Sequence, residues 1–251
     1  MKAEATSYES QDFYFLKRLD DVAILKLGKN FLFEVIDQAI RNPLLDVIDY
    51  IAANERIKVL VIMNCSEQIG CAEYIDFCRQ VFAAEADRIS IQRMCNVFDQ
   101  LILKIIGLNK PVIHVDCGEV ISLFLSMSLA CDYRIIATHT IFEKPYFELE
   151  TLPKGGGAFF LCKMLGYSRA KQLLMSEKDI NALEALEIGI VDQVILFNKL
   201  EETAIQIAHE WAKRPIRSLV GIKRLINYSI KDLRDYLSFE SQELLKTIGT
   251  I

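Results

Sequence analysis

Apolar and polar positions alternate near the start of the chain. Residues 12–27 read DFYFLKRLDDVAILKL, in which two segments rich in β-forming residues flank an Asp pair. A period of two is typical of strands with one buried face, and Asp20 and Asp21 favour a turn. The pattern therefore predicts a β-hairpin over residues 12–27.

The hydrophobic period changes to that of a helix over residues 31–54. The apolar positions that recur every three or four residues are Ile36, Ile40, Leu44, Ile48 and Ile51. This spacing indicates a helix with one apolar face. Because Pro43 lacks a backbone N–H and restricts the preceding turn, we expect it to break or kink the segment into one or two helices.

Continuous apolar runs follow, separated by a helical pattern. Residues 57–63 read IKVLVIM, and further runs of this kind are PVIHV at 111–115, YRIIA at 133–137 and the short TIF at 140–142. Runs rich in β-branched residues are typical of strands buried on both faces. With a helix expected over 121–131, the alternation predicts an α/β layer architecture around a parallel sheet.

From residue 158 onward nearly the whole pattern is helical. One stripe over 200–211 collects Leu200, Ala204, Ile207, Ala208 and Trp211. We find no low-complexity linker that would separate independent units. The expected organisation is a core over residues 1–197 followed by a helical region over 198–251.

Composition and charge narrow the class of protein. The 251 residues are 52% hydrophobic and 25% charged, which excludes disorder for most of the chain. A net charge of −5 and the lack of any run of five basic residues disfavour nucleic acid and anionic membranes as partners. The longest apolar run, 120–131, is shorter than the roughly 20 residues of a membrane-spanning helix. Residues 1–12 lack the pattern of a secretory signal, so we expect a cytoplasmic protein.

The cysteines and histidines favour structural roles. The seven cysteines are odd in number and form no CxxC pair, which indicates reduced thiols. His114, His139 and His209 show no metal-ligand spacing, so no metal site is expected.

Three segments in one order resemble the enoyl-CoA hydratase/isomerase (crotonase) family. They are KPVIHVDCGEVISLFLSMSLACDYRIIA at 110–137, FEKPYFELETLPKGGGAFFL at 142–161 and LGYSRAKQLLMSEKDINALEALEIGIVDQVI at 165–195. The first is similar to the run in which a strand leads through a triple glycine into a helix ending ACD. The resemblance implies a crotonase-like spiral of ββα repeats. It also implies a C-terminal helical region that packs subunits into trimers, often paired into hexamers.

The same resemblance implies an oxyanion hole for a coenzyme A thioester. Two backbone N–H groups would hold the thioester oxygen and stabilise an enolate, each worth roughly 2.7–4 kcal/mol in the transition state. The matching positions are Ala72, in IGCAEY, and Leu123, where the family has the middle glycine of its triple. Because Ser122, Leu123 and Phe124 replace that triple, we expect a narrowed or reshaped acyl pocket.

The catalytic carboxylates of the family are not kept. Ser126 and Tyr146 stand at the positions of the two glutamates that hydratases use, and neither is a carboxylate base. Ordinary hydration by the family mechanism is therefore not expected. Glu150 is the preferred candidate for a relocated base, Glu143 and Glu148 flank the same loop, and Tyr146 is a candidate hydrogen-bond or proton donor.

Candidates for coenzyme A binding also follow from the resemblance. Gly70, Ala72 and Tyr74 match the turn that holds the adenine, and Lys223 resembles a lysine near the nucleotide end. Lys29 is a weaker candidate, and a solvated helix lysine is the plainer interpretation of Lys223. Coenzyme A would enter as part of the substrate, with no other cofactor.

Three functions remain open at this point. The first is an acyl-CoA or carrier-bound thioester enzyme of the hydratase/isomerase kind, forming a homotrimer or hexamer. The second is a decarboxylase with Tyr146 as proton donor. The third is a non-catalytic scaffold subunit, in which Leu123 and Phe124 would fill the pocket.

Overall fold

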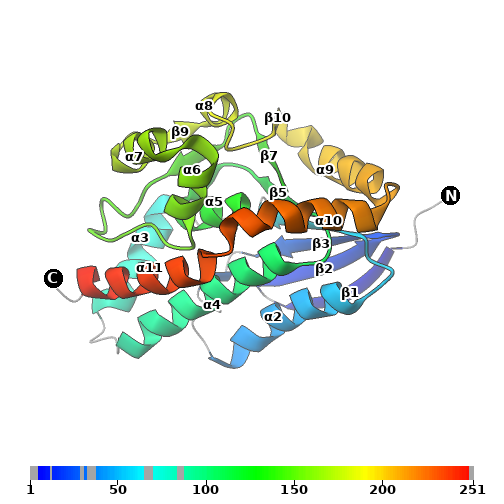
Figure 1. The fold of residues 1–251 in the computed structure, drawn as a ribbon. Coiled ribbons are helices and arrows are strands. Elements are labelled where there is room, and N and C mark those ends of the chain that lie inside the picture. Colours follow the sequence, from blue (N-terminus) through cyan, green and yellow to red (C-terminus); the bar gives the residue numbers. More distant parts are fainter. Residues whose placement is uncertain are drawn as a thin grey trace.

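A computed structural model gives the arrangement of two sheets and the helices that cover them (Figure 1). It describes residues 5–11, 13–28, 31–32, 38–64, 70–83 and 88–248. Lys29 and Cys65 lie outside the described residues. The six cysteines within them form no disulfide.

The larger sheet has the strand order β1-β2-β3-β4-β5-β7-β10. Its strands are β1 (Ala5–Gln11), β2 (Tyr14–Leu19), β3 (Val22–Leu27), β4 (Val59–Asn64), β5 (Val112–Asp116), β7 (Tyr133–Ala137) and β10 (Gln193–Ile195). The predicted hairpin is confirmed, because β2 and β3 pair antiparallel around a turn in which Asp20 has a φ of 51°. Strand β1, which lies in the polar start of the chain, was not expected and extends this hairpin.

The predicted parallel sheet is confirmed in its centre. β3, β4, β5, β7 and β10 pair parallel in that order. Every residue of β4 and of β5 is buried, as expected of strands covered on both faces.

Helices cover both faces of this sheet (Figure 1). On one face, Val59, Val61 and Met63 of β4 belong to a cluster with α9 (Phe197–Ala212). On the other, Leu60 and Ile62 belong to the larger cluster that includes α2 (Gln38–Ala53), α4 (Arg88–Gly107) and α5 (Ser122–Leu129). The period-two alternation of β4 thus divides its side chains between two cores.

Pro43 does not break the helix that follows the hairpin, and a kink at Pro43 stays a prediction. Helix α2 runs from Gln38 to Ala53 with Pro43 inside it. A proline in a helix interior costs about 3 kcal/mol. Downstream of it, Leu44, Ile48 and Ile51 are buried, and the burial of such side chains at about 1.5–3 kcal/mol each offsets that cost.

The smaller sheet positions the candidate site. It consists of β6 (Glu119–Ile121), β8 (Ile141–Glu143) and β9 (Ile180–Asn181) in the order β6-β8-β9. Helix α5 follows β6 directly, and α3 (Cys71–Ala83) contacts the same strand.

The remaining helices complete the chain. They are α6 (Gly157–Leu165), α7 (Tyr167–Met175), α8 (Ala182–Glu187), α10 (Ile216–Asn227), the 3-10 turn η1 (Tyr228–Ile230) and α11 (Leu233–Ile248). Helix α11 lies beside α4 (Figure 1). The apolar stripe predicted on α9 is confirmed, with Leu200, Ala204 and Ala208 buried against the sheet. The division into 1–197 and 198–251 stays a prediction. None of the described helices is both long enough and apolar enough to cross a membrane.

Candidate functional site

The start of α5 presents free backbone N–H groups. The residue before the helix, Ile121, is extended, and no side chain caps the helix. The first turn of any helix has N–H groups without intrahelical acceptors. No described residue accepts a hydrogen bond from the Leu123 N–H.

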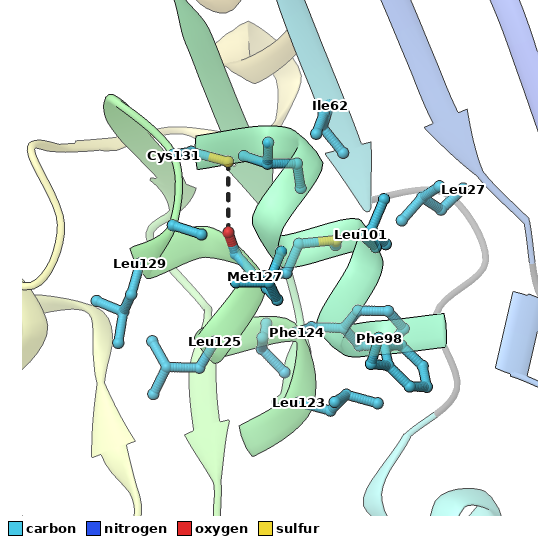
Figure 2. Packing of buried hydrophobic residues seen from close by; sticks show 14 of the residues in the cluster. Leu27, Ile62, Phe98, Leu101, Leu123, Phe124, Leu125, Met127, Leu129 and Cys131 are labelled. Atoms are coloured by element: carbon cyan, nitrogen blue, oxygen red, sulfur yellow. Dashed lines mark hydrogen bonds between the residues drawn. The ribbon is translucent and has the colours of Figure 1, made fainter. Parts of the chain in front are cut away.

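Two of the three side chains that replace the triple glycine, those of Leu123 and Phe124, point into the core. Leu123 is 5% exposed and Phe124 is 3% exposed. The Phe124 ring lies 6.0 Å from that of Phe31, which in turn lies 6.1 Å from Phe98. Figure 2 shows both replacements within this apolar cluster. The two side chains therefore fill the core behind α5, while the backbone N–H of Leu123 stays in the first turn of the helix.

The start of α3 is the second source of N–H groups. Glu73 Oε2 accepts a hydrogen bond of 2.7 Å from the Gly70 N–H. The backbone of Cys71 lies close enough to the Glu143 carboxylate to act against the rise in its pKa. Ala72 is exposed, and no described residue accepts a hydrogen bond from its N–H. The positive end of the helix dipole favours negative charge at this place.

Glu143 joins the two helix starts. It ends β8, and in the parallel register it lies opposite Ile121, the residue that precedes α5. Its carboxylate meanwhile reaches Cys71 at the start of α3. The structure thus brings the starts of α3 and α5 to one place, with a carboxylate between them.

The surroundings of Glu143 raise the pKa of its carboxyl group. Its Oε2 atom is buried and lacks a hydrogen-bond partner in the described part of the chain. Burial, and next the negative charges of Glu119 and Asp179, raise the pKa of Glu143 to about 7. A carboxyl whose pKa lies near neutral pH can both accept and return a proton, as a general acid–base group must.

A small cavity adjoins this carboxyl. Its polar lining comes from Ser122, Ser126, Glu143, Lys144 and Tyr146, and its volume is about 20 Å³. Roughly 10–15 Å³ of such volume is needed for one water molecule. The cavity therefore has room for a single water and none for an acyl chain.

The hydroxyl groups at the two glutamate positions are already used. Ser126 Oγ donates to the Ser122 carbonyl oxygen at 2.9 Å, and the Tyr146 hydroxyl donates to the Leu174 carbonyl oxygen at 3.0 Å. Burial raises the pKa of Tyr146 to about 12. Both side chains line the cavity, and in this arrangement neither offers a proton to it.

The other carboxylates of the loop lie outside the cavity. Glu150 is exposed, has a φ of 50°, and takes part in a turn in which its N–H donates to the Phe147 carbonyl oxygen at 3.2 Å. Glu148 forms an exposed ion pair of 2.9 Å with Arg79. The structure therefore does not bring Glu150, the preferred candidate base, to the residues that line the cavity.

The candidates for coenzyme A binding are divided between two places. Gly70, Ala72 and Tyr74 lie together at the start of α3, where burial raises the pKa of Tyr74. Lys223, in contrast, is 7% exposed on α10.

The ammonium group of Lys223 is fully engaged in the interior. It donates to Asp132 Oδ2 at 2.8 Å and to the carbonyl oxygens of Ile105 and Lys110, both at 3.2 Å. These contacts use its three protons, so a phosphate would have to displace one of them. They tie α10 to the core.

Sequence comparison identifies the family of the chain. A sequence model of the enoyl-CoA hydratase/isomerase family matches residues 20–250. The chain therefore belongs to this family, as the motifs predicted.

Among individual relatives, the short-chain enoyl-CoA hydratase of Clostridium acetobutylicum is 31% identical over 144 residues, 57% of this chain and 55% of the relative. The trans-2-decenoyl-[acyl-carrier-protein] isomerase of Streptococcus mutans is 29% identical over 145 residues, with coverage of 57% and 55%. The chain thus matches about half the length of these curated relatives.

Solved structures show the same fold. An enoyl-CoA hydratase from Bacillus halodurans superimposes with a TM-score of 0.80 at 17% identity, over 94% of this chain and 95% of that one. Pseudomonas aeruginosa DspI gives a TM-score of 0.75 at 20% identity, over 96% of each chain. The predicted crotonase fold is confirmed.

The sequence favoured Glu150 as the candidate base, whereas the structure favours Glu143. Glu143 stands in FEKPY at the end of the short strand β8, with its side chain half-buried. The carboxyl ends of strands in α/β folds are common positions of binding sites. Only the fold showed that this end meets the starts of both α3 and α5.

Proposed function

We propose that this protein forms the enolate of an acyl thioester and shifts the double bond of an enoyl group, with Glu143 as the single proton-transfer residue. The observation that carries the proposal is the position of Glu143 between the starts of α3 and α5, with one buried oxygen that has no partner among the described residues. The N–H groups of Ala72 and Leu123 would bind the thioester oxygen.

The proton balance of this reaction needs one carboxylate. Glu143 removes a proton from the α-carbon of a 3-enoyl thioester, and the electron pair of that C–H bond moves into a dienolate whose oxygen is held by the two N–H groups. The carboxyl then returns its proton to the γ-carbon, which leaves the conjugated 2-enoyl thioester. Glu143 ends the cycle as the carboxylate that began it.

This balance favours isomerisation over hydration. Hydration in this family pairs two glutamates around a water, and the corresponding positions hold Ser126 and Tyr146. One of the relatives is named as an isomerase of trans-2-decenoyl groups on acyl carrier protein, and another as a hydratase of short-chain enoyl-CoA. We infer that the substrate is an enoyl group on coenzyme A or on a carrier protein.

Decarboxylation receives no support from the site. It would need a proton donor at the α-carbon, and the candidate Tyr146 donates to the Leu174 carbonyl oxygen with its pKa raised to about 12.

A non-catalytic thioester-binding or scaffold subunit is the second candidate. The observation that favours it is the cavity beside Ser126 and Tyr146, whose volume of about 20 Å³ admits no acyl group. In this case the Glu143 carboxylate would take the place beside the starts of α3 and α5 in which a thioester oxyanion would otherwise bind.

We also infer a homotrimer or hexamer in the cytoplasm. Helix α10 supports self-association, since Ile222, Leu225 and Ile226 are exposed at 53%, 78% and 64% on its surface. Light scattering with size-exclusion chromatography tests this, and a monomer at micromolar concentration would contradict it.

Deuterium exchange at the α-carbon tests the proposed chemistry. The protein is incubated in D₂O with trans-3- and trans-2-decenoyl-CoA and with decanoyl-CoA, and deuterium and double-bond position are read by NMR and mass spectrometry. We expect α- and γ-deuterium in the enoyl esters and isomerised product.

The other outcomes separate the candidates. Thermal stabilisation by the thioesters without any deuterium uptake would favour a binding subunit. If the esters neither exchange nor stabilise the protein, and the same esters on acyl carrier protein also fail, the proposed function is wrong and the scaffold is favoured.

A further inference from the structure

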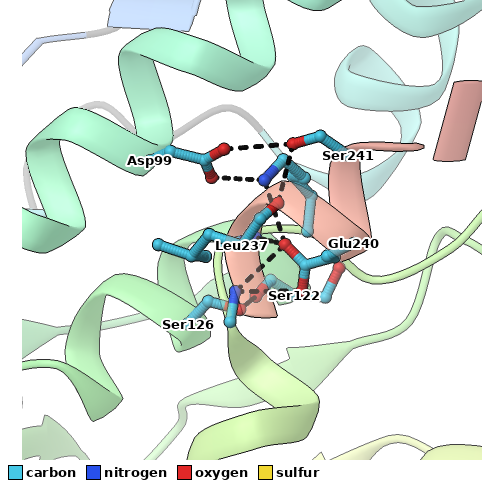
Figure 3. A network of polar contacts seen from close by, with 9 residues as sticks. Asp99, Ser122, Ser126, Leu237, Glu240 and Ser241 are labelled. Atoms are coloured by element: carbon cyan, nitrogen blue, oxygen red, sulfur yellow. Dashed lines mark hydrogen bonds and ion pairs between the residues drawn. The ribbon is translucent and has the colours of Figure 1, made fainter. Parts of the chain in front are cut away.

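A second group of buried polar residues lies close to Ser122 and Ser126 of α5, where the C-terminal helix packs (Figure 3). Lys154 Nζ forms an ion pair with Asp99 of α4 and one of 3.0 Å with Glu240 of α11. Ser241 Oγ donates to Asp99 Oδ2 at 3.0 Å. Lys154 and Glu240 are 6% and 5% exposed, so their charges are stabilised by each other and by nearby polar groups.

Glu240 also binds the backbone before α6. Its Oε2 accepts from the Gly155 N–H at 2.8 Å, and its Oε1 accepts from the Gly156 N–H at 3.0 Å. Gly155 and Gly156 have φ values of 90° and 80°, a conformation that residues with a side chain rarely adopt. The carboxylate thus binds two backbone N–H groups of a turn whose glycines have positive φ.

The glycine turn is in contact with α5. A Cβ on Gly157 would lie 2.6 Å from Ser126 Oγ, and one on Gly155 would lie 3.1 Å from Ser126 Cβ and 3.6 Å from Leu123 Cδ1. These distances mean that the turn packs directly on Leu123 and Ser126. A displacement of the turn would move the first turns of α5.

We propose that Glu240 is a positioning residue that fixes the glycine turn 155–157 against α5 and thereby sets the place of the Leu123 N–H. This inference rests on the proposed function, in which that N–H binds the thioester oxygen. It assigns to the C-terminal helix a role in the geometry of the site, although no residue of α11 lines the cavity beside Glu143.

The variant Glu240→Gln separates this role from the ion pair. Lys154 keeps Asp99 as its partner, so the substitution leaves a neutral buried pair and no uncompensated charge. An amide oxygen in the place of Oε2 still accepts from the Gly155 N–H at 2.8 Å and more weakly from the Gly156 N–H at 3.2 Å, while the amide N–H group in the place of Oε1 repels the Gly156 N–H. The variant should therefore fold and lose one of the two contacts to the glycine turn.

Ser241→Ala is the matched control. It changes the neighbouring residue of α11 and removes a hydrogen bond of the same network, the one to Asp99, without touching the glycines. Both variants are compared with the full-length wild-type protein by hydrogen–deuterium exchange of the peptides that cover 153–160 and 121–130.

We expect Glu240→Gln to exchange about tenfold faster in both peptides and Ser241→Ala to stay within about twofold of wild type. In the isomerisation assay, Glu240→Gln should lower kcat about tenfold with KM within about twofold, because small misplacements of a catalytic group can cost up to 10²-fold. Ser241→Ala should leave both constants unchanged.

The inference is wrong if Glu240→Gln exchanges at the wild-type rate, or if both variants exchange equally faster than wild type. It is also wrong if exchange becomes faster in the peptide 153–160 while the peptide 121–130 is unaffected. The exchange result is independent of turnover. An inactive wild type would contradict the proposed function alone, while the exchange would still decide whether Glu240 positions α5. If Glu240→Gln fails to fold, Gly155→Ala supplies the second test, because it displaces the turn from the other side.

Discussion

Two groups of polar residues lie close to α5, and they differ in how deeply they are buried and in how completely they are paired. In the network of Lys154, Asp99 and Glu240, each charged group has an ionic partner and the carboxylates accept further hydrogen bonds. At the starts of α3 and α5, by contrast, Glu143 has a buried oxygen without a partner, and the N–H groups of Ala72 and Leu123 have no acceptor among the described residues.

The difference in pairing distinguishes a structural network from the catalytic site that we propose. Buried polar groups are nearly always hydrogen-bonded, and an unpaired one costs about 1–3 kcal/mol. A paired network stabilises one conformation. A set of unpaired donors beside a carboxyl of raised pKa is an arrangement that a ligand can complete, and this is why we assign the chemistry to Glu143.

The largest expected effect follows from removing the proposed base. Glu143→Gln keeps the shape of the side chain and removes its ability to take a proton. We expect a loss of about 10³-fold in kcat for double-bond isomerisation, within the 10²–10⁴-fold range of general acid–base catalysis. Steady-state kinetics with decenoyl-CoA measures it.

Glu148→Gln is the control for this variant. Glu148 lies on the same loop in an exposed ion pair with Arg79, so its loss should leave kcat within about twofold. Equal losses in both variants would mean that the charge of the loop, and not the place of Glu143, matters.

The next effect tests the paired network. Lys154→Met removes the cation from between the carboxylates of Asp99 and Glu240. Breaking a buried ion pair from one side costs about 3–5 kcal/mol, and we expect about 3 kcal/mol because backbone N–H groups still bind Glu240. Urea unfolding at pH 7 measures the loss.

Lys199→Met is the matched control, because Lys199 forms an exposed pair with Glu202 and should contribute less than about 1 kcal/mol. A loss below 1 kcal/mol for Lys154→Met would contradict the view that this network holds α11 in place.

The sequence predicted the elements better than the site. The hairpin, the buried strands β4, β5 and β7, and the stripe of α9 each follow from a local period, so they could be predicted. Pro43 could not, because its helix is maintained by burial against residues far along the chain. The motifs predicted the family, and their assignment of Ala72 and Leu123 as donors stays a prediction.

The choice among carboxylates could not be made from the chain alone. Glu143 ends β8 and Glu150 lies in the turn that follows, and their order in sequence does not say which carboxylate is buried. The parallel pairing of β8 with β6 directs Glu143 to the helix starts, whereas the turn at Glu150 directs it to solvent. That pairing is a long-range contact without a local signal.

A smaller effect concerns pH. The pKa of Glu143 is raised from 4.5 to about 7, so the folded state binds its proton more tightly than the unfolded state. The resulting stability is present below pH 4.5 and is lost as pH rises through 7. Because the carboxyl is only partly buried, we discount the shift for solvent screening and expect about 1–2 kcal/mol.

Urea unfolding of wild type and Glu143→Gln at pH 4.5 and pH 8 measures this term. The variant should gain stability relative to wild type as pH rises, while kcat/KM of the wild type should increase with a midpoint near pH 7. If the stability of Glu143→Gln relative to wild type is the same at both pH values, Glu143 titrates normally. The contrast between the paired network and the unpaired groups at the helix starts would then lose its main consequence.

The smallest effect decides the role of Tyr146. Its hydroxyl donates to the Leu174 carbonyl oxygen, so Tyr146→Phe removes one hydrogen bond and should cost about 0.5–1.5 kcal/mol of stability. Turnover should stay within about twofold, because the proton that Tyr146 carries is already committed and its pKa of about 12 opposes transfer. Kinetics and urea unfolding of the same preparation measure both quantities. A loss of turnover beyond about tenfold would mean that Tyr146 is a catalytic residue. The proposed site would then consist of Tyr146 together with Glu143 and the two N–H groups.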